Sequence, residues 1–142
     1  MRQTLASLFS PSATLLIALL LPAQALAGIC FKSTTGTGEQ MIVKLTVAGQ
    51  AEEFFNLLGE AIHTAGCATS ESSPLNGTAH LRSDGKVHFG MTVRGTLHCD
   101  PVMLQGLLNP PSYDSGSGTF DIVNGDYGNA SFSAVACPSL PQ

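Results

Sequence analysis

Two histidines in the stretch AHLRSDGKVHFG, residues 79–90, have the type and spacing that could bind a metal ion. His80 and His88 lie on either side of a short turn, and imidazole nitrogen is a ligand that suits Zn²⁺, Cu²⁺ and Ni²⁺. Two ligands do not complete a site. A third would have to come from His63, His98 or an acidic side chain.

The turn decides whether the two histidines face each other. The apolar residues of segments 75–82 and 86–94 are all odd-numbered. A three-residue loop at 83–85 pairs odd positions with odd ones, so both apolar sets share one face, whereas a two-residue loop separates them. The glycine that ends the longer loop supplies the left-handed residue that this loop type requires. The register therefore predicts that His80 and His88 are directly opposed on the polar face.

The same register places Arg82 opposite Lys86, beside the histidines. Two positive charges oppose a bound cation. We therefore interpret the histidine pair as the solvated face of a β-hairpin, with a metal contact as the alternative, and we expect no cofactor.

The four cysteines, Cys30, Cys67, Cys99 and Cys137, are separated by at least 32 residues. Structural zinc sites take their cysteines as close pairs, whereas an even number of distant cysteines in a small exported domain is typical of disulfides. His98 could activate Cys99 as a nucleophile, but adjacent strand residues point to opposite faces. We expect two disulfides.

Other signals of catalysis are absent from the sequence, which has no G-x-S-x-G motif, phosphate-binding P-loop or H-E-x-x-H pair. Residues 121–126 do not have the spacing of a calcium loop and are typical of a turn. We expect the protein not to be an enzyme.

The N-terminal residues 1–27 have the layout of a secretory signal peptide, with Arg2, an apolar run over 13–21 and a small-residue ending at 25–27. The apolar run is shorter than the roughly 20 residues of a spanning helix. We expect export to the periplasm or the extracellular space, one domain over 28–142, and no membrane span.

Charge argues against a nucleic-acid partner. After residue 27, five scattered Lys and Arg residues stand against ten Asp and Glu, a formal charge of −5. A phosphate backbone requires a clustered basic surface, which this distribution does not provide.

Alternation of apolar and polar residues predicts β-structure through most of the domain. Residues 41–48 alternate with period two, and the segments 120–122 and 130–134 repeat the pattern around a turn rich in Gly and Asn. The candidate strands lie near 29–34, 40–48, 53–63, 75–82, 86–95, 96–107, 117–124 and 129–136.

Two segments could instead be helical. Residues 50–64 carry an apolar stripe after an acidic first turn, but the L-x-G-x-A pattern of 57–61 recurs at 75–79 in a well-patterned strand. We favour a strand, with an α+β fold and a helix at about 50–64 as the alternative. The Asp-Pro pair at 100–101 is typical of a helix start, which makes a short helix over 102–108 a second candidate.

Eight sequential strands with short connections predict an all-β fold, a small antiparallel up-and-down barrel that closes to remove exposed edges. This architecture resembles the lipocalin and avidin barrels in outline. Closure places the first strand beside the last, which predicts a Cys30–Cys137 disulfide and leaves Cys67–Cys99 as the second.

The stretch NPPSYDSGSG, residues 109–118, is predicted to be an exposed loop, because its prolines and its Ser and Gly residues do not support a central strand. Loops on small rigid scaffolds often carry recognition. Tyr113 and Asp114 are the candidate contacts, and a plain connector is the alternative.

Three function classes follow. The favoured one is an exported, disulfide-stabilised binding or interaction module that contacts another exported protein through loop or rim residues. The second is a carrier of a small apolar ligand inside the barrel, and the third is an enzyme with no recognisable motif.

We predict that the exported protein begins at Gly28 and carries no lipid, because Ile29 does not suit the residue just before a lipoprotein cleavage site. The intact mass of protein purified from its host should correspond to residues 28–142. A retained leader, or an acyl mass on Cys30, would contradict this prediction.

Overall fold

The computed structural model describes residues 29–36, 38–63, 66–68 and 71–138. The expected leader, 1–27, lies outside the described residues. None of the described segments forms a helix with the length and hydropathy needed to cross a membrane.

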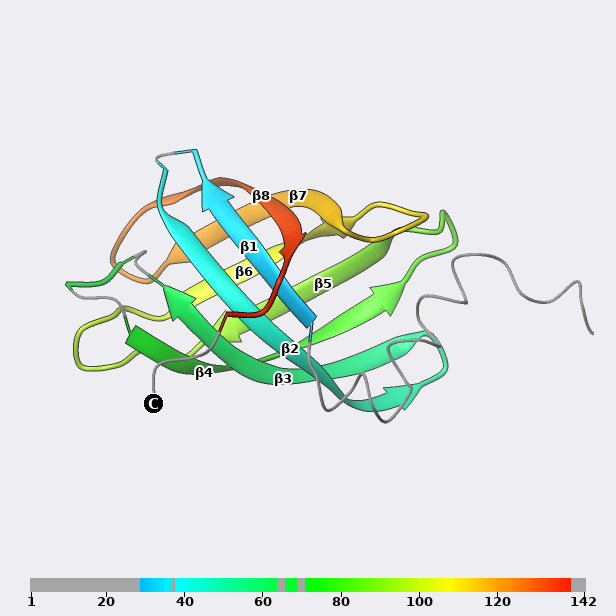
Figure 1. Cartoon of the computed structure of the whole chain (residues 1–142), viewed down its shortest axis with the longest axis horizontal. Coiled ribbons are helices and arrows are strands. Elements are labelled where there is room, and N and C mark those ends of the chain that lie inside the picture. Colours follow the sequence, from blue (N-terminus) through cyan, green and yellow to red (C-terminus); the bar gives the residue numbers. More distant parts are fainter. Residues whose placement is uncertain (1–28, 37, 64–65, 69–70, 139–142) are drawn as a thin grey trace, which may run out of the picture.

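The described residues form eight strands in one closed antiparallel barrel, in which each strand pairs with its neighbours in sequence and β1 also pairs with β8 (Figure 1). The strands are β1 (Ile29–Thr35), β2 (Gln40–Ala51), β3 (Phe54–His63), β4 (Glu71–Leu81), β5 (Val87–Val93), β6 (Val102–Leu108), β7 (Ser115–Ile122) and β8 (Tyr127–Val135). The predicted all-β up-and-down barrel is confirmed. The alternative helix at about 50–64 is wrong, because this segment contains strand β3.

The short helix considered over 102–108 is also wrong, since these residues form β6. Val102 and Leu104 point into the barrel, while Met103 lies on the outer face. Pro101 lies just before the strand, where its missing N–H removes no ladder bond. Pairing with both β5 and β7 stabilises the extended form over the local helix signal.

The β4–β5 hairpin has the predicted register. Leu81 pairs with Val87, and His80 pairs with His88. Gly85 has a φ of 80°, and its N–H donates to the carbonyl of Arg82 at 3.0 Å. The three-residue loop thus aligns the apolar faces of both strands.

Inward-facing side chains fill the barrel. Phe89 and Phe132 meet edge to face with ring centroids 4.9 Å apart. Around them lie Met41, Val43, Leu45, Phe55, Leu57, Leu75, Val87, Met91, Val93, Val102, Leu104, Phe120 and Ile122, all buried. The interior is therefore mainly a packed core and not a channel.

Two disulfides link parts of the barrel that are distant in sequence. Cys30 in β1 bonds to Cys137, just after β8, with the Cα atoms 5.1 Å apart, and so fastens the seam where the barrel closes. Cys67 bonds to Cys99 with the Cα atoms 4.0 Å apart, which ties the β3–β4 connection to the β5–β6 connection. These are the two pairings expected from closure.

The barrel has two different ends, which lie at the left and right of Figure 1. The disulfide end, at the left, consists of the described residues that connect β1 to β2, β3 to β4, β5 to β6 and β7 to β8, together with the Cys67–Cys99 bond. The tyrosine end, at the right, consists of the connections from β2 to β3, β4 to β5 and β6 to β7, the last of which contains Tyr113.

Glycines occupy inward positions where neighbouring backbones approach closely. A Cβ atom on Gly59 would lie 1.9 Å from the carbonyl oxygen of Lys44, and one on Gly77 would lie 2.2 Å from that of Gly90. Gly59 pairs with Leu75, and Gly77 pairs with Leu57. The repeated L-x-G-x-A pattern thus places each glycine beside the leucine of the other copy.

We predict that Gly77→Ala lowers the free energy of unfolding by about 2–3 kcal/mol, because the added methyl overlaps backbone atoms that cannot rotate away. The matched control is Gly90→Ala, whose Cβ would meet nothing within 4 Å. It should change stability by less than about 0.5 kcal/mol. Denaturant unfolding of both variants is the measurement, and equal effects would contradict the prediction.

Candidate functional site

The predicted histidine pair lies on the outer face of the hairpin. His80 stacks on Phe54 with ring centroids 4.4 Å apart, and its Nε2 is 3.7 Å from a carboxylate oxygen of Glu53. His88 lies opposite and is exposed. Within the described ranges, neither histidine belongs to a group of three side chains close enough to hold one metal ion.

Tyr113 is not the exposed contact predicted from the loop composition. Its side chain is only 4% exposed, and its hydroxyl donates a hydrogen bond to the carbonyl of Gly85 at 2.6 Å. This bond joins the β6–β7 loop to the hairpin loop across the tyrosine end. Asp114 is exposed, and its backbone carbonyl accepts a hydrogen bond from the N–H of Ala134.

The buried polar residues gather at the opposite end. Ser33 and Thr35 come from β1, His63 from β3 and Ser73 from β4, and all four are buried inside the disulfide end. Ser33 pairs with Met41, which in turn pairs with His63. In the part of the chain that is described, the rest of the buried interior is apolar.

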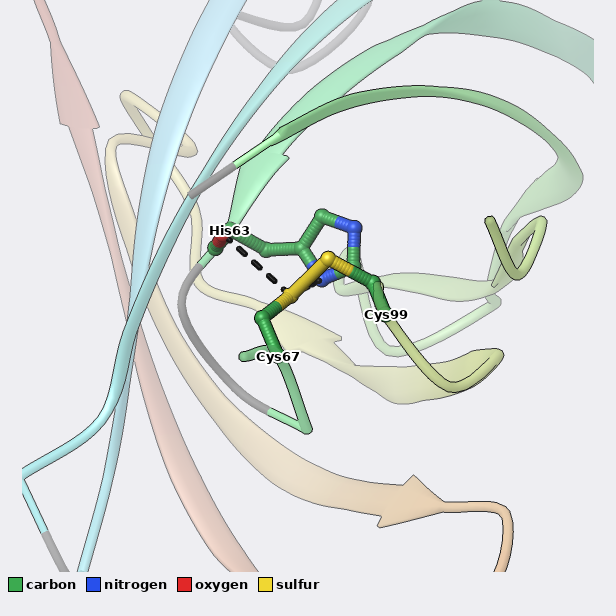
Figure 2. Close-up of side chains that lie close together, drawn as sticks. All are labelled: His63, Cys67 and Cys99. Carbon is green, nitrogen blue, oxygen red and sulfur yellow. Dashed lines mark hydrogen bonds between the residues drawn. A yellow bond between two sulfur atoms is a disulfide. The ribbon is translucent and has the colours of Figure 1, made fainter. Parts of the chain in front are cut away.

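His63 is fully buried between Ser73 and the disulfide, and Figure 2 shows its ring beside the disulfide. Its Nε2 lies 3.0 Å from Ser73 Oγ, and its Nδ1 lies 3.3 Å from Cys67 Sγ. A disulfide sulfur has no proton to donate, so the proton of the neutral ring is assigned to Nδ1. The Ser73 hydroxyl then donates to Nε2.

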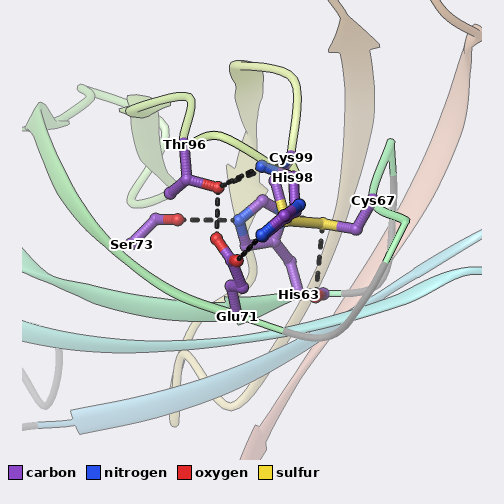
Figure 3. The surroundings of a disulfide bond; sticks show 7 residues. All are labelled: His63, Cys67, Glu71, Ser73, Thr96, His98 and Cys99. Carbon is purple, nitrogen blue, oxygen red and sulfur yellow. Dashed lines mark hydrogen bonds and ion pairs between the residues drawn. A yellow bond between two sulfur atoms is a disulfide. The ribbon is translucent and has the colours of Figure 1, made fainter.

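A second layer of hydrogen bonds holds the loop that carries Cys99 (Figure 3). The Thr96 hydroxyl donates to Glu71 and accepts the N–H groups of Cys99, at 3.1 Å, and His98, at 3.3 Å. His98 Nε2 lies 3.7 Å from the other carboxylate oxygen of Glu71. The N–H of Ala68 donates to the carbonyl of His98, which joins the two disulfide-linked loops a second time.

The serine–histidine pair does not have the geometry of a nucleophilic catalyst. A catalytic pair needs a substrate-accessible hydroxyl and a group that orients the imidazole, usually a carboxylate. Ser73 is 1% exposed and His63 is 0% exposed. The group at His63 Nδ1 is a disulfide sulfur. This geometry supports a structural role for the pair in the oxidised protein.

A small hollow opens beside this cluster at the disulfide end. Its empty space, counted out to the solvent, is about 200 Å³. The polar side of the hollow is formed by Ser33, Thr35, Glu39 and Gln40, and its apolar side by Met41, Val102, Leu104 and Phe120. It lies at one mouth of the packed barrel.

Glu39 is the acidic residue that lines this hollow. The β1–β2 turn holds its backbone, because its N–H donates to Thr35 Oγ1 at 3.0 Å and its carbonyl accepts the Thr35 N–H at 3.0 Å. Its Oε2 is buried and accepts no hydrogen bond from the described residues. Sequence reasoning missed Glu39, although the period of β2 places it on the same inward face as Met41.

A group of exposed apolar side chains lies on the outer face of β6 to β8 at the same end. Met103 pairs across the strands with Asp121, which pairs with Tyr127, and Val123 lies two residues further along the same face. Such diagonal positions are within reach of large side chains. Met103, Val123 and Tyr127 are 46%, 40% and 70% exposed. These three residues are called the rim patch below.

Comparisons with known proteins support the fold. No protein-family model and no curated protein matches the sequence. A de novo designed fluorescence-activating β-barrel is 15% identical with a TM-score of 0.53, over 77% of this chain and 92% of that chain. A redesigned β-barrel bound to DFHBI is 13% identical with a TM-score of 0.54, over 80% and 97% of the two chains. At these identities the similarity shows the barrel fold alone.

We predict that Ser73→Ala lowers the free energy of unfolding by about 1–3 kcal/mol, because it leaves the buried His63 Nε2 without its donor. Ser72→Ala is the matched control. The Ser72 side chain is exposed, so its removal should change the free energy of unfolding by less than about 0.5 kcal/mol. Both are measured by denaturant unfolding without reductant. A neutral effect of Ser73→Ala would contradict the assigned hydrogen bond.

Proposed function

We propose that the protein is a non-enzymatic binding barrel of the periplasm or the extracellular space that takes a small organic cation at its disulfide end. The two disulfides are consistent with an oxidising, exported environment. The observation that carries the proposal is the buried carboxylate oxygen of Glu39, a residue that lines the hollow, which accepts no hydrogen bond from the described residues.

A buried acceptor without a donor costs free energy, and a carboxylate costs more than a neutral group. A ligand with an ammonium group would remove this cost by donating to Glu39 Oε2. Its short apolar part would lie against Met41, Leu104 and Phe120, on the other side of the hollow. The lining thus matches a molecule that is positively charged at one end and apolar at the other.

The charge of the disulfide end favours the same class of ligand. The described acidic residues in its connections are Glu39, Asp100 and Asp126, with Glu71 and Asp121 at the adjoining strand ends, and the bases are Arg94, His98, which faces Glu71, and the buried His63. A negatively charged mouth raises the local concentration of cations and their rate of entry.

Size limits the ligand. The hollow's empty space of about 200 Å³ includes space that is open to solvent, so the enclosed part admits only a small group. The designed barrels with a similar fold are fluorescence-activating or bound to DFHBI, so this architecture can hold a small ligand. The packed core gives less support to a carrier of an apolar ligand deep inside the barrel.

A protein partner is the second candidate, and the rim patch is the observation that favours it. Met103, Val123 and Tyr127 lie on the outer face at the disulfide end, and Leu97 in the β5–β6 loop is 91% exposed. Grouped apolar residues at a loop rim are typical of contact surfaces. Such a partner would also cover the hollow.

We predict that n-butylammonium binds the protein and that n-butanol, which has a similar shape and no charge, binds at least ten-fold more weakly. Amide shifts in NMR titrations should move first at Thr35, Gly38 and Met41. Glu39→Gln keeps the shape of the side chain and removes its charge, so it should weaken butylammonium binding at least ten-fold.

The matched control is Glu60→Gln, which makes the same change of net charge on the exposed face of β3. It should leave binding unchanged. Equal affinity for the amine and the alcohol, or equal loss in both variants, would overturn the proposal. Loss of a natural protein partner on Tyr127→Ser, with no effect of Glu39→Gln, would support the second candidate.

A further inference from the structure

His63, Cys67 and Cys99 form the single group of three potential metal ligands in the described segments. His63 Nδ1 and the two sulfur atoms all lie within 4.8 Å of one another (Figure 2). The three residues come from the end of β3, the β3–β4 connection and the β5–β6 connection. Cys67 is half-buried, so one side of the group can be reached from solvent.

We infer that reduction of the Cys67–Cys99 bond creates a zinc site made of both thiolates and His63 Nδ1. A dithiol reductant supplies two electrons and two protons, the sulfur–sulfur bond breaks, and the reductant becomes a cyclic disulfide. Zn²⁺ then displaces the two thiol protons, because thiolate is the ligand form. The inference does not depend on the proposed ligand of Glu39.

The positions of the ligand atoms suit a tetrahedral ion. With Zn–S bonds of about 2.3 Å and a Zn–N bond of about 2.0 Å, the sulfur and nitrogen ligands lie about 3.5 Å apart. His63 Nδ1 and Cys67 Sγ are 3.3 Å apart before any movement. The two sulfurs have to separate, which cleavage of their bond allows, and Cys99 Sγ, which lies within 4.8 Å of Nδ1, has to come to ligand distance with them. The fourth position remains for water or another small ligand.

The Ser73 hydroxyl can form a hydrogen bond with His63 Nε2 both before and after metal binding at Nδ1. In the oxidised protein its hydroxyl donates to Nε2, whereas metal binding at Nδ1 moves the ring proton to Nε2. The Ser73 hydroxyl, 3.0 Å away, then becomes the acceptor. A metal-binding histidine commonly donates its second N–H to such a partner, which fixes the ring and its tautomer. The second ligand shell of the site is therefore already present.

The donor set selects the metal class. Two thiolates and one imidazole favour Zn²⁺ over Mg²⁺ and Ca²⁺, which take oxygen ligands. Glu71, the nearest acidic residue in the surrounding network, is engaged by Thr96 and His98 (Figure 3). The other cysteine pair, Cys30 and Cys137, has no histidine in such a group among the described residues and serves as an internal control.

The test is a Co²⁺ titration of the full-length protein, reduced anaerobically with a dithiol that is then removed. Co²⁺ bound to thiolates gives a near-ultraviolet charge-transfer band and visible bands typical of four-coordinate geometry. We expect one Co²⁺ per chain, displacement by one equivalent of Zn²⁺, and no such bands in the oxidised protein. Cys67→Ser or Cys99→Ser should weaken binding at least 100-fold, and His63→Gln at least ten-fold.

Two controls separate the site from other thiols and histidines. The first control is the double variant Cys30→Ser, Cys137→Ser, and the second is His88→Gln. Each should bind Co²⁺ with the affinity of the unchanged protein. Far-ultraviolet circular dichroism reports whether each reduced protein keeps its strands. If the reduced protein unfolds, one equivalent of Zn²⁺ should restore the strand signal.

The inference is overturned if the reduced, folded protein gives no thiolate–Co²⁺ band. It is also overturned if Zn²⁺ fails to restore the strands of an unfolded reduced protein, or if the double variant loses binding while Cys67→Ser keeps it.

Discussion

Closure of the sheet on itself is the constraint on which the rest of the structure depends. Because β1 pairs with β8, all eight inner faces share one narrow interior. Backbones then approach so closely that a side chain has no room at certain inward positions, such as Gly77 and Gly118. Large side chains from neighbouring strands fill the space that these glycines leave, which is how the barrel keeps a packed core.

The local pattern of the sequence predicts those parts of the fold in which alternation and turn chemistry agree. The β4–β5 register followed from odd-numbered apolar residues and Gly85. Closure then predicted the Cys30–Cys137 pairing, which left Cys67–Cys99 as the second. Strand β6 was harder, because a Pro after an acidic residue can begin a helix or precede a strand. Its extended form depends on pairing with β5 and β7, which no local window contains.

The candidate site was less predictable, because distant residues build it. Tyr113 lies in a loop of exposed composition, yet its hydroxyl bonds to Gly85, 28 residues away. Glu39 lies in the β1–β2 turn, where an acidic residue is ordinary. Its inward position becomes visible only when the two-residue period of β2 is extended back to it. The polar residues inside the disulfide end, Ser33 and Ser73 among them, come from β1, β3 and β4. Only the closed barrel brings them together.

The two ends of the barrel are closed by different means, and this difference explains where a site can form. At the tyrosine end one aromatic ring is buried and its hydroxyl is satisfied by a backbone carbonyl. At the disulfide end a covalent bond joins two of the connections, and small polar residues such as Ser33 and Ser73 lie inward beside the large ones. Small and polar residues at core positions break the pattern of the rest of the interior. Such breaks are expected where function, and not packing, determines the residue.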